Sequence, residues 1–289
     1  MKSPPCILAT TDLLDATRPA VDRAFRLAAE TGAQLGLMHI LRQRTTDELR
    51  KLLGKESGEV EARLREQAQA DLEKLAAELG QKHGVSANLH LASGKLLQSI
   101  IEQADAIDAD LLVFGSNGGD FLVSSTASRL LRLTKLPILV VKRPPQDLYR
   151  CVLAPLDFSP GSATALHLAR ELAPQANFTL LHAFESPFDC QLRHAGLTDA
   201  VIQQLRGNAK VDAQQQLESF AAMVSGPTET KLLPSQCDAA QCIIDQEQAQ
   251  HCDLIVMGRH GANMVEEFLL GSVTKQVLAE SHGDVLVVA

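Results

Sequence analysis

The chain has 289 residues, long enough for one large domain or for two of about 145 residues each. Hydrophobic residues make up 45% and charged residues 21%, which is typical of a folded globular protein and excludes a disordered, collagenous or coiled-coil chain. Apolar runs such as Ile138 to Val141 are far shorter than the roughly 18 residues of a membrane span, and residues 1–14 lack the apolar core of a signal peptide. We therefore expect a cytoplasmic protein with no membrane segment.

The formal net charge of −8 comes entirely from the second half of the chain. Residues 1–149 contain 19 basic and 19 acidic side chains, whereas residues 150–289 contain 8 basic and 16 acidic ones. There is no Trp, and Tyr149 is the one Tyr, so the chain lacks both a strongly basic composition and the aromatic residues on which bases stack. We expect no nucleic-acid partner.

The six cysteines form no C-x2-C pair. The spacing of Cys237, Cys242 and Cys252, with His251 beside them, could be that of metal ligands, but structural zinc sites normally combine two close pairs. The alternative is that these cysteines are small buried apolar side chains on helices and strands. We favour the alternative and predict no metal site.

The chain contains an internal repeat. Two matching pairs are CILATTD at 6–12 with CVLAPLD at 151–157, and DLLVFG at 110–115 with DLIVMG at 253–258. The first pair is offset by 145 residues. The segment RPPQ at 143–146 reads as a linker, because paired prolines can continue neither a helix nor a central strand. We predict two domains, residues 1–143 and 149–289.

Short apolar runs alternate with amphipathic stretches in each copy. In the first copy the charged stretch Glu56 to Leu79 is expected to be a solvated helix. In the second copy the expected strands are 151–156, 179–184, 231–233, 254–257 and 285–288, and the expected helices are 162–173, 198–224, 239–250 and 272–281. The loop Phe188 to His194 could act as a lid. Continuous Val/Ile/Leu runs separated by helices indicate a parallel sheet covered on both faces. We predict an α/β fold of two tandem doubly wound, Rossmann-like domains, each with a five-stranded parallel sheet in the order 3-2-1-4-5.

The last strand of each copy, Ile138 to Val141 and Val285 to Val288, is apolar and would lie at a sheet edge. An open apolar edge invites pairing. We expect these two strands to pair with each other, which would make an intramolecular pseudo-dimer, or with those of another chain, which would make a homodimer.

A candidate anion site follows the fourth strand of the second copy. Ligands of doubly wound sheets bind beyond the carboxyl ends of the strands, where the strand order reverses. There the chain reads GRHG at 258–261, then nine residues, then GSV at 271–273 opening a helix. Glycines let the backbone approach a ligand, and a helix N-terminus presents unpaired N–H groups. Because Arg259 and Lys275 are the only nearby bases, phosphate there would be held by amides and a divalent cation.

This G-x2-G-x9-G-[ST] motif, with Asp157 closing the first strand of the same unit, resembles the universal stress protein family over both copies. The resemblance implies an adenine nucleotide α-hydrolase-like fold and, in the nucleotide-binding branch of the family, bound ATP, ADP or AMP with Mg²⁺. It implies contacts to adenine from Asp157 and from the backbone around Pro155, Leu156 and Ala183, contacts to ribose and phosphate from Gly258, His260 and Gly261, and a phosphate cradle of Gly271, Ser272 and Val273. Met257 is a further expected nucleotide-binding residue.

The first copy departs from this pattern. It keeps Asp12, Gly115 and Gly118, but five residues separate Gly118 from Ser124 and Ser125, four fewer than in the second copy. Ser124 stands where the second copy has Gly271, which adds a Cβ where the backbone should approach phosphate. We expect the first domain to be a degenerate, structural one, with Ser124, Ser125 and Thr126 forming a helix N-cap.

Some residues of the motif have simpler interpretations. Asp157 or Ser159 could cap the helix that follows the first strand of the second copy. His39 and His182 end apolar strands and are expected to be hydrogen-bonded core histidines rather than catalysts. The spacing of Ser, Asp and His residues suggests no catalytic triad, and no catalytic residue is predicted.

The resemblance therefore implies a tandem universal stress protein that binds an adenine nucleotide in its second domain and acts as a stress-response sensor or regulator with at most slow hydrolysis. One alternative is a nucleotide-independent dimerisation scaffold, as in family members without the glycines. Another is an adenylating enzyme of a related fold, but those enzymes usually carry a further glycine-rich loop after the first strand, and Pro155 to Ser159 has none.

Overall fold

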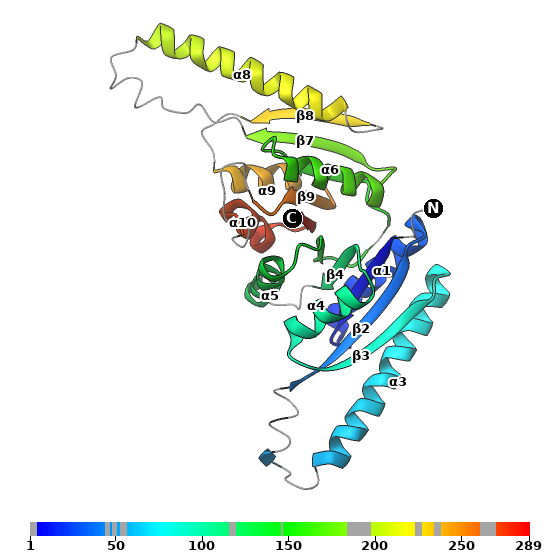
Figure 1. Ribbon diagram of the computed structural model, residues 1–289. Coiled ribbons are helices and arrows are strands. Elements are labelled where there is room, and N and C mark those ends of the chain that lie inside the picture. The colour runs from blue at the N-terminus through cyan, green and yellow to red at the C-terminus, as the bar shows by residue number, and fades with distance from the viewer. Residues whose placement is uncertain are drawn as a thin grey trace. The chain divides into compact units, whose positions relative to one another are not determined.

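The computed structural model describes residues 5–43, 47, 51–52, 57–115, 120–145, 147–183, 198–222, 227–233, 238–260 and 270–289. The chain divides into two compact units, residues 1–148 (unit 1) and residues 149–288 (unit 2), each of which alternates strands and helices (Figure 1).

Unit 1 contains a parallel sheet in which β1 lies between β2 and β4, with β3 and β5 outside them. Its described elements are β1 (Cys6–Thr11), the 3-10 turn η1 (Asp15–Thr17), α1 (Arg18–Thr31), β2 (Gln34–Arg42), α3 (Ser57–His83), β3 (Ala87–Gly94), α4 (Leu96–Ala106), β4 (Leu111–Gly115), α5 (Asp120–Leu133) and β5 (Ile138–Val141). The strand order is 3-2-1-4-5, which confirms the prediction.

Unit 2 repeats this topology, with β6 between β7 and β9 and with β8 and β10 outside them. Its described elements are β6 (Cys151–Pro155), α6 (Pro160–Leu172), β7 (Asn177–Ala183), α8 (Asp199–Ala222), β8 (Thr228–Leu233), α9 (Ala239–Gln250), β9 (Leu254–Gly258), α10 (Ser272–Glu280) and β10 (Asp284–Val288). The predicted helices and strands of this copy are all present, with shifted ends. β8 begins three residues before its predicted start. The prediction missed these residues because their sequence, Thr-Glu-Thr, contains no apolar side chain.

The cores lie on both faces of the central strands. Consecutive residues of β1, Leu8 and Ala9, are completely buried, as are Val152 and Leu153 of β6. Because successive side chains of a strand point to opposite faces, burial of both neighbours means that both faces are covered. This explains why the strands read as continuous apolar runs.

The helix α3 matches the predicted solvated helix of the first copy. It runs along the outer strand β3 (Figure 1) and buries Ala68, Leu72 and Leu79, while most of its other side chains are exposed or half-buried. α8 lies along β8 in the corresponding place and buries Ile202, Ala213 and Leu217. A narrow apolar line therefore holds each long helix to its sheet.

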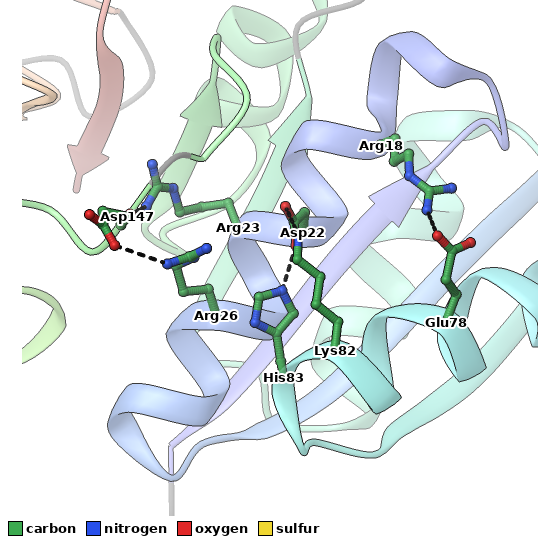
Figure 2. A network of polar contacts seen from close by, with 8 residues as sticks. All are labelled: Arg18, Asp22, Arg23, Arg26, Glu78, Lys82, His83 and Asp147. Atoms are coloured by element: carbon green, nitrogen blue, oxygen red, sulfur yellow. Dashed lines mark hydrogen bonds and ion pairs between the residues drawn. The ribbon is translucent and has the colours of Figure 1, made fainter.

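A polar network joins α3 to α1 in unit 1 (Figure 2). The carboxylate of Asp22 on α1 accepts hydrogen bonds from Lys82 at 2.9 Å and from the ring of His83, and Arg18 pairs with Glu78. Burial opposes the charge of Asp22, but the hydrogen bonds from His83 and Lys82 outweigh it and lower the pKa of this carboxyl. The network compensates for the small apolar contact of α3.

The end of unit 1 is also held by α1. Arg23 donates to the carbonyl oxygen of Asp147 at 2.8 Å, and Arg26 lies 3.8 Å from the Asp147 carboxylate (Figure 2). Arg23 is buried, so water does not satisfy its N–H donors. The bond to the Asp147 carbonyl gives one of these donors an acceptor within the protein. The segment after β5 is therefore fixed to the fold of unit 1.

Candidate functional site

The carboxyl ends of β6 and β9 lie side by side where the strand order of unit 2 reverses. β6 ends at Pro155 and β9 ends at Gly258. The two strands are parallel, and their register pairs Val152 with Leu254. In doubly wound folds this is the edge at which ligands bind. The structure therefore brings together the ends of the two strands that carry the predicted motif.

Asp157 organises the turn from β6 into α6. Its Oδ1 accepts hydrogen bonds from the Ser159 amide at 3.0 Å, from the Ser159 hydroxyl at 2.6 Å and from the Ser162 hydroxyl. Ser159 is the N-cap of α6 and accepts a hydrogen bond from the Ser162 amide at 3.2 Å. Of the two capping alternatives, Ser159 is the cap, and Asp157 orients it. A role of Asp157 toward adenine stays a prediction.

The residue after this Asp has a left-handed backbone in both units. Phe158 has φ 62° and Leu13, after Asp12, has φ 65°. A bulky residue in this region costs on the order of 1–3 kcal/mol and persists where its surroundings hold it. The ring of Phe158 lies over His182, with 4.2 Å between ring centroids. Both units therefore keep the same costly turn at the end of their first strand.

His182 and His39 occupy equivalent positions near the ends of β7 and β2. Nδ1 of His182 lies 2.7 Å from the Leu156 carbonyl oxygen, and Nδ1 of His39 lies 2.9 Å from the Thr11 carbonyl oxygen. A carbonyl oxygen accepts only, so each ring donates from Nδ1. The prediction that both histidines form hydrogen bonds within the fold is confirmed. His39 ties β2 to the last residue of β1, and His182 ties β7 to the residue after β6.

Contacts with the described residues do not require glycine at Gly258 or Gly271. Neither has a positive φ, and an added Cβ would lie 3.5 Å and 3.4 Å, respectively, from the nearest atom of the described residues, which is ordinary van der Waals contact. In unit 1 the position equivalent to Gly258 is Gly115, where a Cβ would lie only 3.1 Å from the Cβ of Ala20 on α1. Packing therefore explains Gly115, whereas packing against the described part of the chain gives no reason for the two glycines of unit 2.

The N-terminus of α10 has unpaired amides beside these glycines. Gly271 is the N-cap, no side chain of the described residues caps the helix, and the amide of Lys275 makes its bond to the Gly271 carbonyl at 3.0 Å. The amides of Ser272, Val273 and Thr274 come before that bond, so they have no acceptor one turn back within the helix. Helices α6 and α9 of the same unit are each capped by a side chain. This arrangement suits an anion.

Thr274 is a site residue that the sequence did not predict. Its buried hydroxyl donates to the Gly258 carbonyl at 3.2 Å and lies 3.4 Å from the Arg259 carbonyl. It therefore fixes the first turn of α10 to the end of β9. The two predicted basic neighbours differ, because Arg259 is buried, with 4% of its surface exposed, while Lys275 is exposed.

For the remaining predicted site residues, the structure gives backbone hydrogen bonds or positions at or near the strand ends. Leu156 donates its amide to the Leu181 carbonyl at 2.7 Å, and Ala183 is the last residue of β7. Met257 is buried on β9, next to Gly258, and His260 is half-buried two residues after that strand ends. Gly261, the first-copy Gly118 and the predicted lid Phe188 to His194 lie outside the described residues.

The expected N-cap of the first copy is wrong. Helix α5 begins at Asp120, so Ser124 and Ser125 lie inside the helix rather than at its start. The helix therefore includes residues 120–123 before the two serines, and α5 has 14 residues where α10 of unit 2 has 9.

Unit 1 contains a cavity that the sequence did not predict. Its volume is about 1030 Å³, and its lining includes Arg42 at the end of β2, Lys95 and Leu96 at the start of α4, and Arg129 of α5. A smaller cavity of about 40 Å³ touches Asp12 among other residues. The large one has the size of a ligand site. Its residues come from segments far apart in the sequence, so no linear motif could have indicated it.

The cysteines do not support the metal-ligand alternative. Cys242 is disulfide-bonded, which removes the thiolate that zinc would need, and the sulfur of Cys252 contacts that of Cys151. His251 is the exposed, left-handed C-cap of α9. Within the described ranges there is no group of three or more His, Cys, Asp or Glu side chains placed to bind a metal, and Cys237 is outside those ranges.

Together these features define an α/β protein with two doubly wound units. One of them carries, at its switch point, a glycine-flanked helix N-terminus with no cap from a described side chain. The model of the universal stress protein family matches residues 6–142 and 148–289. The chain therefore belongs to the universal stress protein family, with two family domains in tandem.

Several known proteins are similar to this chain. Universal stress protein A homolog 1 of Coxiella burnetii is 28% identical over 139 residues, which are 47% of this chain and 94% of that protein. A universal stress protein of Thermus aquaticus is 32% identical over 126 residues, 44% of this chain and 87% of that protein. The crystal structure of a universal stress protein from Archaeoglobus fulgidus has a TM-score of 0.73 at 18% identity and covers 100% of this chain and 99% of its own, a likeness of fold.

None of the helices in the described ranges combines the length and the apolar character needed to cross a bilayer.

Proposed function

We propose that unit 2 binds ATP, or ADP or AMP, in the crevice between the ends of β6 and β9, and that the chain acts in the cytoplasm as a stress-response sensor or regulator. In this proposal Asp157 and the backbone of Pro155, Leu156 and Ala183 meet adenine. The ribose and phosphates are met by the segment that follows Met257, namely Gly258, His260 and Gly261, and by the cradle Gly271, Ser272 and Val273.

The observation that carries the proposal is the pair of glycines at the uncapped start of α10. Gly258 and Gly271 have ordinary backbone conformations, and the residues that the structure describes around them leave room for a Cβ, so those residues give no reason for glycine. Next to them the amides of the first turn of α10 have no capping side chain among the residues that the structure describes. A phosphate needs both features, a close approach to the backbone and unpaired N–H donors.

We propose that Mg²⁺ accompanies the phosphates. Residues 150–289 contain 8 basic and 16 acidic side chains, so they offer little positive charge to a polyphosphate. A divalent cation on the phosphate oxygens would supply the missing charge.

Hydrolysis is proposed to be slow at most. Oδ1 of Asp157 already accepts three hydrogen bonds, and Nδ1 of His182 is bonded to the Leu156 carbonyl. Both groups are therefore engaged in holding the turn, and neither is poised through these atoms to activate water, as efficient phosphoryl transfer requires. A regulator that changes conformation or partner with its nucleotide fits this arrangement.

Unit 1 is proposed to be structural. The apolar strands β5 and β10 are proposed to be covered by pairing, within the chain or between two chains.

The competing function is a nucleotide-independent dimerisation scaffold. The cavity of about 1030 Å³ favours one further candidate, a second ligand site in unit 1.

Thermal unfolding of the full chain in increasing Mg-ATP tests the proposal. Ligand at 100 times its dissociation constant adds about 2.7 kcal/mol to stability, so the melting temperature should rise. Native mass spectrometry should then show one nucleotide per chain. No shift at millimolar ATP, ADP or AMP would support the scaffold, and two nucleotides per chain would assign one to unit 1.

A further inference from the structure

Two thiols meet at the amino ends of β6 and β9, at the edge of the sheet opposite the proposed nucleotide site. Cys151 is the first residue of β6, and Cys252 lies two residues before β9. Their sulfur atoms are 2.7 Å apart, and neither is in a disulfide. A disulfide bond is about 2.04 Å long, so an approach of about 0.7 Å would join the two sulfurs.

The backbone holds these two cysteines in place. The amide of Asp253 donates to the Cys151 carbonyl at 3.0 Å, and the Asp253 carboxylate accepts from the amides of Cys151 at 3.1 Å and Arg150 at 2.8 Å. The amide of Cys252 donates to the Glu247 carbonyl at 2.9 Å. The residues that flank the thiols are therefore fixed on both strands, and the contact does not depend on a free loop.

Unit 1 has the same framework with a single thiol. Cys6 is the repeat equivalent of Cys151, and Asp110, the equivalent of Asp253, donates its amide to the Cys6 carbonyl at 2.8 Å and accepts from the Cys6 amide at 2.8 Å. The position equivalent to Cys252 is Ala109, whose amide bonds to the Ala104 carbonyl at 2.9 Å. Unit 1 therefore serves as an internal control, with one cysteine on the same backbone framework.

The second thiol changes the acidity of the first. The hydrogen bond from Cys252 lowers the pKa of Cys151, with help from Lys231 and against burial and the charges of Asp253 and Glu229. The same hydrogen bond raises the pKa of Cys252, which keeps its proton. For Cys6, burial together with the charges of Asp110 and Asp108 raises the pKa. Thiolate character is therefore concentrated on Cys151.

We propose that Cys151 and Cys252 form a peroxide-sensitive thiol pair that closes to a disulfide between β6 and β9. Cys151 is half-buried and Cys252 is 1% exposed, so Cys151 is the thiol that meets an oxidant and Cys252 is the resolving thiol. The pair is independent of the proposed nucleotide binding, because it uses the opposite ends of the strands.

The oxidant is a hydroperoxide. The Cys151 thiolate attacks one oxygen of hydrogen peroxide, so that an S–O bond forms, the O–O bond breaks, hydroxide leaves and the sulfur is oxidised to a sulfenic acid. The Cys252 sulfur then attacks the sulfenic sulfur, so that the S–S bond forms and the S–O bond breaks. The departing hydroxide takes the proton of Cys252 and leaves as water.

Peptide mapping of the full chain after peroxide treatment tests the pair. The reduced protein is treated with a small excess of hydrogen peroxide, its remaining thiols are blocked with N-ethylmaleimide, and its peptides are identified by mass spectrometry. We expect a peptide cross-linked between Cys151 and Cys252 with two hydrogens lost, while Cys6 stays alkylated. In Cys252→Ser we expect a dimedone adduct on Cys151 in place of the cross-link.

The matched variant is Ala109→Cys, which places a second thiol beside Cys6 on the same framework. It should add a peroxide-sensitive cross-link in unit 1. The proposal is overturned if Cys6 of the unaltered chain reacts as fast as Cys151, if Cys151 pairs with any other cysteine, or if both thiols stay alkylated after peroxide. Because the main readout uses the unaltered protein, it holds even if a variant does not fold.

Discussion

Replacing Gly271 by Asp separates the role of this residue in the fold from its proposed role in binding. Gly271 has φ −56° and ψ 149°, which any residue adopts, and an added Cβ would lie 3.4 Å from the nearest atom. Asp is among the best N-cap residues, worth a few tenths of a kcal/mol over Gly, and a carboxylate at a helix N-terminus adds about 0.3–1 kcal/mol. Without ligand, Gly271→Asp should be as stable as the unaltered protein or more stable by up to about 1 kcal/mol.

The same carboxylate should abolish nucleotide binding. It would accept from the amides that open α10 and would repel a phosphate from them. In the unaltered protein, ATP at 100 times its dissociation constant contributes about 2.7 kcal/mol. At about 2–4 °C per kcal/mol this raises the melting temperature by roughly 5–10 °C. In Gly271→Asp we expect this rise to disappear.

Differential scanning fluorimetry with and without Mg-ATP measures both effects on the same samples. Ser124→Asp is the control, since Ser124 stands at the position of Gly271 in the repeat but lies inside α5. It should keep the rise caused by ATP. The reasoning is refuted if Gly271→Asp retains the full rise, or if it melts several degrees lower without nucleotide, because glycine would then serve the fold.

Three further predictions concern stability. Gly115→Ala should cost about 1–3 kcal/mol in urea unfolding, because its Cβ would lie 3.1 Å from a side chain of α1, whereas Gly258→Ala should stay within about 1 kcal/mol and yet weaken ATP binding in calorimetry. Asp22→Asn should cost about 1.5–3 kcal/mol at pH 7. The folded-state pKa of Asp22 lies below its ordinary value of 3.8, so this stabilisation is present above that pH and is lost as the pH falls through the folded-state pKa. The unfolding curves of the two proteins should therefore converge in acid. A difference in stability that stays constant with pH would contradict the assignment. Peroxide-treated protein should unfold at a higher urea concentration than Cys252→Ser. Its free energy of unfolding should be greater by about 4–5 kcal/mol, the value for a disulfide that closes a loop of about 100 residues, and dithiothreitol should remove the difference.

The strand order could be predicted because the signals for it are local. An apolar run that is buried on both faces has few alternatives to a central parallel strand, and β9 and β10 were placed to within a residue. The start of the outer strand β8 was not predicted, because its first residues, Thr-Glu-Thr, are all polar and give no apolar pattern. The start of α5 was misplaced because Ser124 and Ser125 are good N-caps in isolation, while Asp120 begins the helix earlier.

The candidate site was predictable where one continuous segment forms it. The start of α10 at Ser272 follows from the Gly-Ser pair at the end of the motif. The bond from Thr274 to the Gly258 carbonyl, the left-handed backbone of Phe158 and the cavity beside Arg42 were not predicted. Each of them depends on contacts between segments that the sequence does not join.

The sequence by itself determined the repeat, the parallel α/β topology and the helix start that we propose as an anion site, because apolar periodicity, glycine and helix starts act over a few residues. The tertiary structure alone decided which glycines serve packing, since a Cβ added at Gly115 would lie 3.1 Å from a side chain of α1, whereas one at Gly258 would meet no described atom closer than 3.5 Å. It alone also decided that Cys151 and Cys252, 101 residues apart along the chain, share a sulfur contact. Such distances follow from how strands and helices pack, and no spacing along the chain encodes them.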